Sequence, residues 1–187
     1  AGRGQGHFLS LEVASLPTLG FDVGGTNARG LVLDASGRDS RHVAELSPAQ
    51  PGALVEMIAS MAGGLARSAG LDAPSIGIGC AGTFDESGVV LTSPNLPALE
   101  GVPLLGELRK ALPGPVVLEN DATSASWGEH QLGAGSGHAD MALVTLGTGI
   151  GTGFVLGGRL LRGASGAAGE SGHMVIVADG LTCACGH

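Results

Sequence analysis

Two segments of this chain share one pattern, in which an apolar run leads into a loop of glycine and threonine and a second apolar run follows. The first segment covers residues 22–33 and the second covers residues 145–156. Each pattern predicts two short strands around a tight turn. A repeat this long favours a duplicated domain over a solenoid of small units. Because little sequence follows the second copy, we expect the second domain to be incomplete in this chain.

The sequence between the two loops alternates between helical and extended patterns. The segment that begins at Pro51 places apolar residues three or four positions apart, which predicts an amphipathic helix. Helices are expected over 51–69, 103–112 and about 122–132, and buried strands over 74–79 and 115–118. Trp127 and small residues are expected on the packed face of the third helix. This alternation predicts an α/β fold.

Charge and composition exclude several classes of protein. Nine Lys and Arg residues stand against 17 Asp and Glu residues, which gives a formal net charge of -8. An acidic chain is a poor match for nucleic acid or an anionic membrane, and no apolar run approaches the roughly 18 residues that span a bilayer. Lys110 is the only lysine and follows no glycine loop, which excludes a P-loop NTPase. A soluble cytoplasmic enzyme or binding protein remains.

The glycine loops could bind anions, because turns without bulky side chains expose backbone N–H groups. The candidate phosphate-binding residues are Asp22, Gly24, Gly25, Thr26 and Asn27 in the first loop, and Gly147, Thr148 and Gly149 in the second. The carboxylate of Asp22 suits a metal ion bound to that phosphate. Either loop alone could be a plain tight hairpin, but the pair favours a phosphate clamp between two domains. A dinucleotide-binding loop is excluded, because another hairpin follows residues 147–153 where a helix is required.

The motifs resemble those of a known family. The Asp-x-Gly-Gly-Thr loop at 22–26 is similar to the first phosphate loop of the sugar kinase, hexokinase and actin superfamily. The stretch 146–173 resembles the signature of the ROK family (repressor, open reading frame, kinase). Its matching positions are Leu146, Gly149, Ile150, Gly151, Gly153, Phe154, Gly163, Gly169, Gly172 and His173. The strings at 93–97 and 119–122 and the Cys-x-Cys-Gly at 183–186 also resemble the glucokinases of this family.

The resemblance implies two ribonuclease-H-like domains of the actin and hexokinase type around a cleft. Residues 1–121 would form the N-terminal α/β domain, and residues 122–187 would begin the C-terminal domain. The implied reaction is the phosphorylation of glucose at its 6-hydroxyl with ATP and Mg²⁺, by a protein that is a homodimer or homotetramer when complete. We expect this chain by itself to be inactive.

Other members of the same family remain as alternatives. Kinases for N-acetylmannosamine, fructose and mannose share these motifs, and some relatives accept polyphosphate as the phosphate donor. A sugar-sensing transcriptional repressor is the alternative from another class. Such repressors carry a winged helix-turn-helix ahead of the first loop, whereas only a short, non-basic segment precedes Asp22 here. The intact Asp-x-Gly-Gly-Thr loop and Asp121 also favour a kinase.

Polar residues near the expected strand ends are candidates for catalysis and sugar binding. Asp121 lies where a strand is expected to give way to a helix, and a helix N-terminus favours an ionised carboxylate. Asp121 could be no more than a helix cap, but the resemblance implies that it is the general base that takes the proton of the sugar hydroxyl. The resemblance also implies that Asn95, Asn120, Asp121, Glu170 and His173 bind the hexose. The alternatives are a turn residue for Asn95 and a surface charge for Glu170.

The C-terminal segment carries a candidate metal site. His173, Cys183 and Cys185 combine imidazole and thiolate donors, which suit zinc, although a structural zinc site uses four protein ligands. The family pattern implies that the fourth ligand lies five residues after Cys185, past the end of this chain. The alternative is a pair of reduced cysteines without a metal. Cys80 is expected to be a core thiol, and His42, His130 and His138 to be solvated.

Overall fold

The computed structural model describes residues 17–34, 39–147, 149–164, 166, 168–183 and 185. The predicted role of Thr148 in the second loop therefore falls outside the described residues. The N-terminal segment that precedes residue 17 does so too. Among the helices of the described ranges, none combines the length and the hydropathy needed to cross a membrane.

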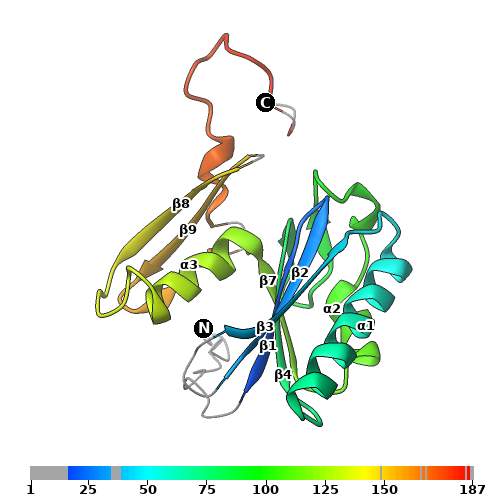
Figure 1. Cartoon of the computed structure of the whole chain (residues 1–187). Coiled ribbons are helices and arrows are strands. Elements are labelled where there is room, and N and C mark those ends of the chain that lie inside the picture. Colours follow the sequence, from blue (N-terminus) through cyan, green and yellow to red (C-terminus); the bar gives the residue numbers. More distant parts are fainter. Residues whose placement is uncertain are drawn as a thin grey trace, which may run out of the picture.

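A five-stranded mixed sheet forms the larger part of the molecule (Figure 1). Its strands are β1 (Thr18–Val23), β2 (Asn27–Leu33), β3 (Asp39–Leu46), β4 (Ser75–Cys80) and β7 (Val116–Asn120), in the order β3-β2-β1-β4-β7. The first three strands form an antiparallel meander, while β4 and β7 run parallel to β1. The carboxyl ends of β1, β4 and β7 therefore lie at one edge of the sheet, where ligands of such sheets bind.

Helices α1 (Pro51–Ala69) and α2 (Leu104–Ala111) cover one face of this sheet (Figure 1). The apolar face of α1 is buried against the strands, and Leu54 and Ile58 are fully enclosed. Pro51 occupies the first helical turn, where its missing N–H costs nothing, and Gly70 ends the helix in a left-handed conformation. Burial of this apolar surface is the main stabilising contribution to the core.

Short elements follow β4 at the same edge of the sheet. They are the hairpin of β5 (Thr83–Phe84) and β6 (Val90–Thr92) and the 3-10 helix η1 (Pro97–Leu99). Ser93, which follows β6, is completely buried, so the turn after it is anchored in the core.

Helix α3 (Asp121–Leu132) leads from β7 to a second, three-stranded sheet (Figure 1). That sheet has the order β10-β9-β8 and contains β8 (Met141–Leu146), β9 (Ile150–Leu156) and β10 (Arg159–Leu160). The 3-10 helix η2 (Glu170–His173) follows and packs against β9. The β9–β10 turn is Gly157-Gly158, and both residues have positive φ, as a two-residue hairpin requires.

Helix α3 lies unusually close to β9 because glycines face it. A Cβ built on Gly153 would lie 2.5 Å from the Cβ of Ser126, and one on Gly151 would lie 2.8 Å from the Cβ of Ala122. Both distances are too short for real side chains. These two glycines of the Gly-rich string therefore permit the packing of strand against helix.

The mixed α/β fold and the helices and strands expected between the two loops are confirmed. Strand β3 and the β5–β6 hairpin were not anticipated. His42 lies on β3, exposed but on a strand instead of a loop. Trp127 is only half-buried and stacks on His130, with ring centroids 5.3 Å apart.

Candidate active site

The first glycine loop, between β1 and β2, packs against the turn that carries Asn95. The N–H of Gly24 donates to the carbonyl of Asn27 at 3.0 Å, which closes the loop. A Cβ on Gly25 would lie 2.6 Å from the carbonyl oxygen of Asn95. Only glycine fits at this position without displacing the Asn95 turn. The structure therefore brings the first candidate phosphate loop and a candidate sugar ligand together.

The Asn95 turn is held by buried polar contacts. The Oγ of Ser93 donates to the carbonyl of Ala81 at 2.6 Å, and the N–H of Ser93 donates to Oε1 of Glu100 at 3.0 Å. The N–H of Leu96 donates back to the carbonyl of Ser93 at 3.0 Å. The side chain of Asn95 itself is exposed. Asn95 is thus a turn residue whose amide is also free to face a ligand.

Asn120, and not Asp121, is the N-cap of α3. Its Oδ1 accepts from the N–H of Thr123 at 2.9 Å. Its Nδ2 donates to the carbonyl of Gly82 at 3.1 Å and to Oδ1 of Asp121 at 3.0 Å. Both amide hydrogens are thereby used within the protein, so Asn120 can offer a sugar hydroxyl only an oxygen lone pair.

Asp121 is the first residue of α3, and its carboxylate lies over the helix N-terminus. Its Oδ1 accepts from the N–H of Ala122 at 2.9 Å as well as from Asn120. Its Oδ2 makes no hydrogen bond to the residues that the structure describes. One oxygen of Asp121 is therefore held in place while the other can accept a proton.

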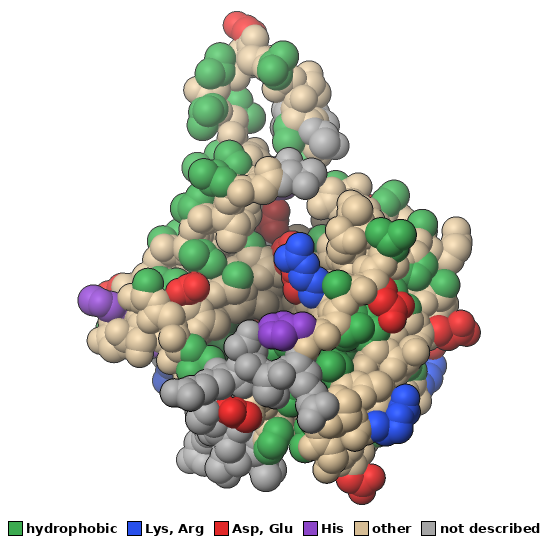
Figure 2. Space-filling view, in the orientation of Figure 1, with side chains coloured by type: hydrophobic (Ala, Val, Ile, Leu, Met, Phe, Trp, Pro, Cys, Tyr) green, Lys and Arg blue, Asp and Glu red, His purple; other side chains and the backbone are tan. Residues whose placement is uncertain are grey.

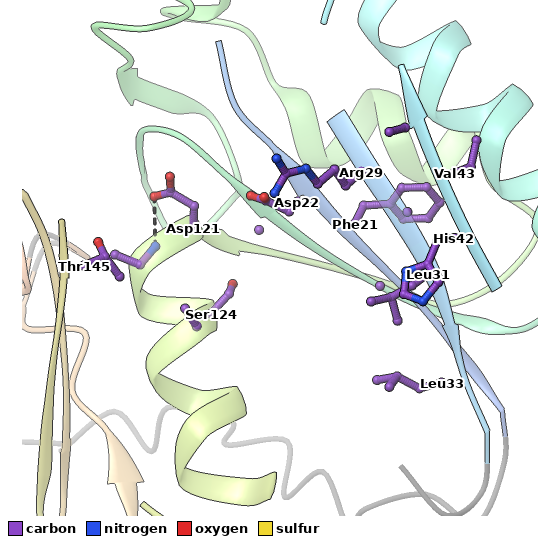
Figure 3. Close-up of a pocket in the computed structure, with 16 residues that line it drawn as sticks. Phe21, Asp22, Arg29, Leu31, Leu33, His42, Val43, Asp121, Ser124 and Thr145 are labelled. Carbon is purple, nitrogen blue, oxygen red and sulfur yellow. Dashed lines mark hydrogen bonds between the residues drawn. The ribbon is translucent and has the colours of Figure 1, made fainter. Parts of the chain in front are cut away.

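Asp121 lies at the edge of an open cavity of about 960 Å³ between α3 and the face of the large sheet opposite α1 and α2. Figure 3 shows Asp121 on α3 and Asp22 on β1 on opposite sides of this opening, with Arg29 beside Asp22. Figure 2 shows acidic, basic and histidine side chains gathered around the hollow. The cavity thus places charged groups on apolar walls, as small-molecule sites do.

The charges in the cavity act on one another. Partial burial raises the pKa of Asp22, the nearby charge of Asp121 raises it further, and the charge of Arg29 lowers it. Arg29 lies directly opposite Asp22 in the register of β1 and β2. The pKa of the Cys80 thiol is raised to about 12, mainly by burial and to a smaller extent by the charges of Asp121 and Asp22. Cys80 is 1% exposed, which confirms it as a core thiol.

Sequence reasoning missed Arg29, His42 and Thr145, which also line the cavity. The signal for Arg29 was present. A hairpin that turns at residues 24–27 pairs Asp22 with Arg29 across the strands and points both to one face. His42 and Thr145 come from strands that only the tertiary structure brings to the cavity.

The second glycine loop divides into two parts. Gly147 and Gly149 form the turn between β8 and β9, where the N–H of Gly147 donates to the carbonyl of Gly149 at 2.9 Å. Apart from its chain neighbours, a Cβ on either of these glycines would have no atom of the described residues within 4 Å. Gly151 and Gly153, in contrast, pack on α3.

Glu170 and His173 lie on η2, which the hydroxyl of Thr152 anchors to β9. The Oγ1 of Thr152 donates to the carbonyl of Gly169 and accepts from the N–H of Ser171 at 3.3 Å. The Nε2 of His173 lies 3.5 Å from Oε2 of Glu170. The structure therefore brings these two candidate sugar ligands together.

His173, Cys183 and Cys185 gather into a cluster whose ligand atoms all lie within 4.8 Å of one another. The Sγ of Cys183 lies 3.4 Å from Nδ1 of His173. Hydrogen bonds from the backbone and side chain of Cys185, and then from His173, lower the pKa of Cys183 to about 7. One nitrogen and two sulfurs fit zinc in ligand type. His173 directs Nδ1 to this cluster and Nε2 to Glu170.

The chain is similar to known proteins over most of its length. The ROK family model matches residues 18–187. A glucokinase from Streptomyces coelicolor is 40% identical over 170 residues, covering 90% of this chain and 53% of that protein. An N-acetylmannosamine kinase from Escherichia fergusonii is 33% identical over 174 residues, covering 91% of this chain and 58% of that protein.

A solved structure is also similar to this chain. The ROK family glucokinase from Streptomyces griseus, in complex with glucose and AMPPNP, superimposes with a TM-score of 0.83 at 40% identity. The match covers 91% of this chain and 54% of that chain. The present chain thus spans about half the length of the curated relatives it matches.

Proposed function

The chain belongs to the ROK family, and we propose on this basis that the protein carrying it phosphorylates glucose at its 6-hydroxyl with ATP as donor. The observation that carries this proposal is the placement of Asp121. Its Oδ1 is fixed by Ala122 and Asn120, its Oδ2 has no partner among the described residues, and the residue lines the cavity. A general base in phosphoryl transfer to an alcohol needs such a pre-positioned carboxylate.

We propose that the hexose binds between the Asn95 turn and η2. Asn95, Asn120, Glu170 and His173 supply donors and acceptors for its hydroxyls, and Asp121 takes the proton of the attacking one. The exposed amide of Asn95 and the paired side chains of Glu170 and His173 support this placement. Two anchored turns hold their side chains at little entropic cost, which favours oriented binding.

The two glycine loops would hold the phosphates of the donor. The first loop is Gly24, Gly25, Thr26 and Asn27, and the second contains Gly147 and Gly149, where open space surrounds both glycines. Asp22 would hold Mg²⁺, and its carboxylate suits this role because it lines the cavity near a second carboxylate, that of Asp121. Bound Mg²⁺ would neutralise charge on the transferred phosphoryl group.

We also propose two domains around a cleft, with residues 1–121 in the first and 122–187 at the beginning of the second. The separate sheets, with α3 between them, support this division. The cluster of His173, Cys183 and Cys185 would hold a structural zinc ion that keeps η2 in place. Zinc content and the stability of the protein on chelation measure this role directly.

The test of the proposed function is sugar-dependent ADP release by the complete protein as its gene encodes it. Glucose, mannose, fructose and N-acetylmannosamine are compared at equal concentrations with ATP, and then with polyphosphate by detection of the phosphorylated sugar. We expect glucose with ATP to give the highest kcat/KM. A preference for N-acetylmannosamine would favour the kinase type of the 33% identical relative. Tight sugar binding without turnover would instead indicate a sugar sensor.

A further inference from the structure

An ion pair connects the strand that precedes Asp121 to the segment that precedes Glu170. The Nε of Arg162 lies 2.6 Å from Oε2 of Glu119. Glu119 is the penultimate residue of β7, and its side chain is 19% exposed. Arg162 lies two residues after β10, so the pair links β7 of the large sheet to the segment that follows the second sheet. The short N–O distance gives a charge-assisted hydrogen bond, which has a defined geometry.

Each partner of this pair makes a second contact toward the candidate site. The other carboxylate oxygen of Glu119, Oε1, accepts from the N–H of Asn120 at 3.0 Å. The backbone carbonyl of Arg162 accepts from the N–H of Ala168 at 3.0 Å. Asn120 precedes Asp121, and Ala168 lies two residues before Glu170. A short series of bonds therefore runs from the general-base candidate to the sugar-binding candidate on η2.

The rest of the described surface offers a contrast. The ion pair of Lys110 with Glu107 has a similar distance of 2.7 Å, but it lies within α2, and its side chains are 74% and 44% exposed. That pair joins neighbouring turns of one helix and connects no separate elements. The pair of Glu119 with Arg162, in contrast, connects β7 to the segment that leads to η2.

We propose that Glu119 and Arg162 are positioning residues that hold the η2 ligands Glu170 and His173 at the right distance from Asp121 for a hexose. The inference rests on the proposed function, because it concerns how that site holds its sugar. The η2 ligands contact the sugar in the ground state and the transition state alike. Loss of the pair therefore weakens binding and raises the KM for the sugar more than it lowers kcat.

The experiment uses the complete protein with the variants Glu119→Gln, Arg162→Met, Arg162→Lys and the double variant Glu119→Gln/Arg162→Met. Glu107→Gln is the matched control, because it makes the same chemical change in the ion pair of α2. Steady-state kinetics give KM for glucose, KM for ATP and kcat. Titration calorimetry gives glucose affinity independently of turnover, and thermal unfolding reports on the fold.

We expect Glu119→Gln and Arg162→Met to raise KM and Kd for glucose about three- to fivefold, the upper part of the range for an exposed ion pair. The KM for ATP should stay unchanged, and Arg162→Lys should recover part of the loss. The double variant should be no worse than either single variant, because both remove the same contact. The Glu107→Gln control should change nothing by more than about twofold.

Two results would overturn the inference. Unchanged glucose affinity in Arg162→Met contradicts it, and so does an equal rise of KM for glucose and ATP accompanied by a lower Tm, because that pattern indicates general loss of structure. A wild-type protein that neither binds nor phosphorylates any hexose refutes the proposed function and this inference with it. Wild-type glucose kinetics with unaffected variants refute the inference alone.

Discussion

Replacing Asp121 with asparagine tests the catalytic assignment with little disturbance of the fold. Oδ1 of Asp121 accepts from the N–H of Ala122 and from Nδ2 of Asn120, and an asparagine oxygen can accept both bonds. The new amide nitrogen then takes the position of Oδ2, which has no partner among the described residues. The substitution removes the negative charge and the capacity to take a proton, and it preserves shape and volume.

The expected magnitudes follow from these contacts. Removal of a negative charge from the first turn of a helix costs about 0.3–1 kcal/mol. Relief of the repulsion between Asp121 and Asp22 acts in the opposite direction, because the charge of Asp121 raises the pKa of Asp22. The free energy of unfolding should therefore change by less than about 1 kcal/mol. Loss of a general base should lower kcat by about 10² to 10⁴.

The assay compares Asp121→Asn with Asp72→Asn in the complete protein, since Asp72 lies exposed in the loop that follows α1. Glucose affinity is measured by calorimetry, kcat by ADP release and stability by urea unfolding. We expect glucose binding within about threefold of the wild type, because the Asn amide still offers polar atoms to the sugar. A kcat of Asp121→Asn within about tenfold of the control would refute the role of general base.

The remaining predictions concern packing, anchoring and pH. Gly153→Ala should lower the free energy of unfolding by about 1–3 kcal/mol, because its Cβ would lie 2.5 Å from that of Ser126. Gly147→Ala, in open space, should leave this free energy unchanged. Equal urea midpoints for the two variants would contradict this prediction. Thr152→Val removes the hydroxyl that holds Gly169 and Ser171. The KM for glucose should therefore rise about fivefold or more while the KM for ATP stays constant. An equal rise of both KM values would contradict the anchoring role. The pKa of Asp22 is raised in the folded state, so folding favours its neutral form. The resulting contribution to the free energy of unfolding is complete below the ordinary pKa of 3.8 and is lost as the pH rises through the raised pKa. Asp22→Asn should therefore be more stable than the wild type at pH 7 and lose this advantage in acid, although inactive as a kinase; equal stability at pH 7 would contradict the shift.

The sequence predicted the elements whose signals are local. The helix from Pro51 has a clear apolar periodicity, a proline in its first turn and a glycine after its end, and the structure has the same bounds. The hairpin around Gly24 and the turn at Gly157-Gly158 follow from the glycine requirements of tight turns. These features depend on residues within a few positions of each other, and a sequence displays them directly.

Strand β3 could not be predicted in this way. Its sequence, Asp39–Leu46, mixes charged and apolar residues without alternation, and most of its described residues are exposed. It is an edge strand that owes its conformation to pairing with β2. Long-range pairing of this kind leaves little trace in local composition.

In the candidate site, too, local signals could be predicted and long-range contacts could not. The position of Asp121 at the beginning of α3 follows from local signals, but the identity of the cap does not. Asn120 takes that role because Gly82, far away in the sequence, accepts from its amide and fixes its rotamer. Likewise, His130 was expected to be solvated, yet its ring stacks on Trp127 and its Nε2 lies 2.9 Å from the carbonyl of His138.

The close contact between α3 and β9 has a consequence for how the family signature is interpreted. Within one string, Gly147 and Gly149 border open space, while Gly151 and Gly153 allow a strand to touch a helix. Under the proposed function the first pair would face the donor phosphates, whereas the second pair serves the fold. A sugar-binding relative that has abandoned phosphoryl transfer is therefore free to replace the first pair but must keep the second. If the proposed function holds, replacement of Gly147 and Gly149 would indicate loss of phosphoryl transfer, whereas Gly151 and Gly153 indicate only the shared fold.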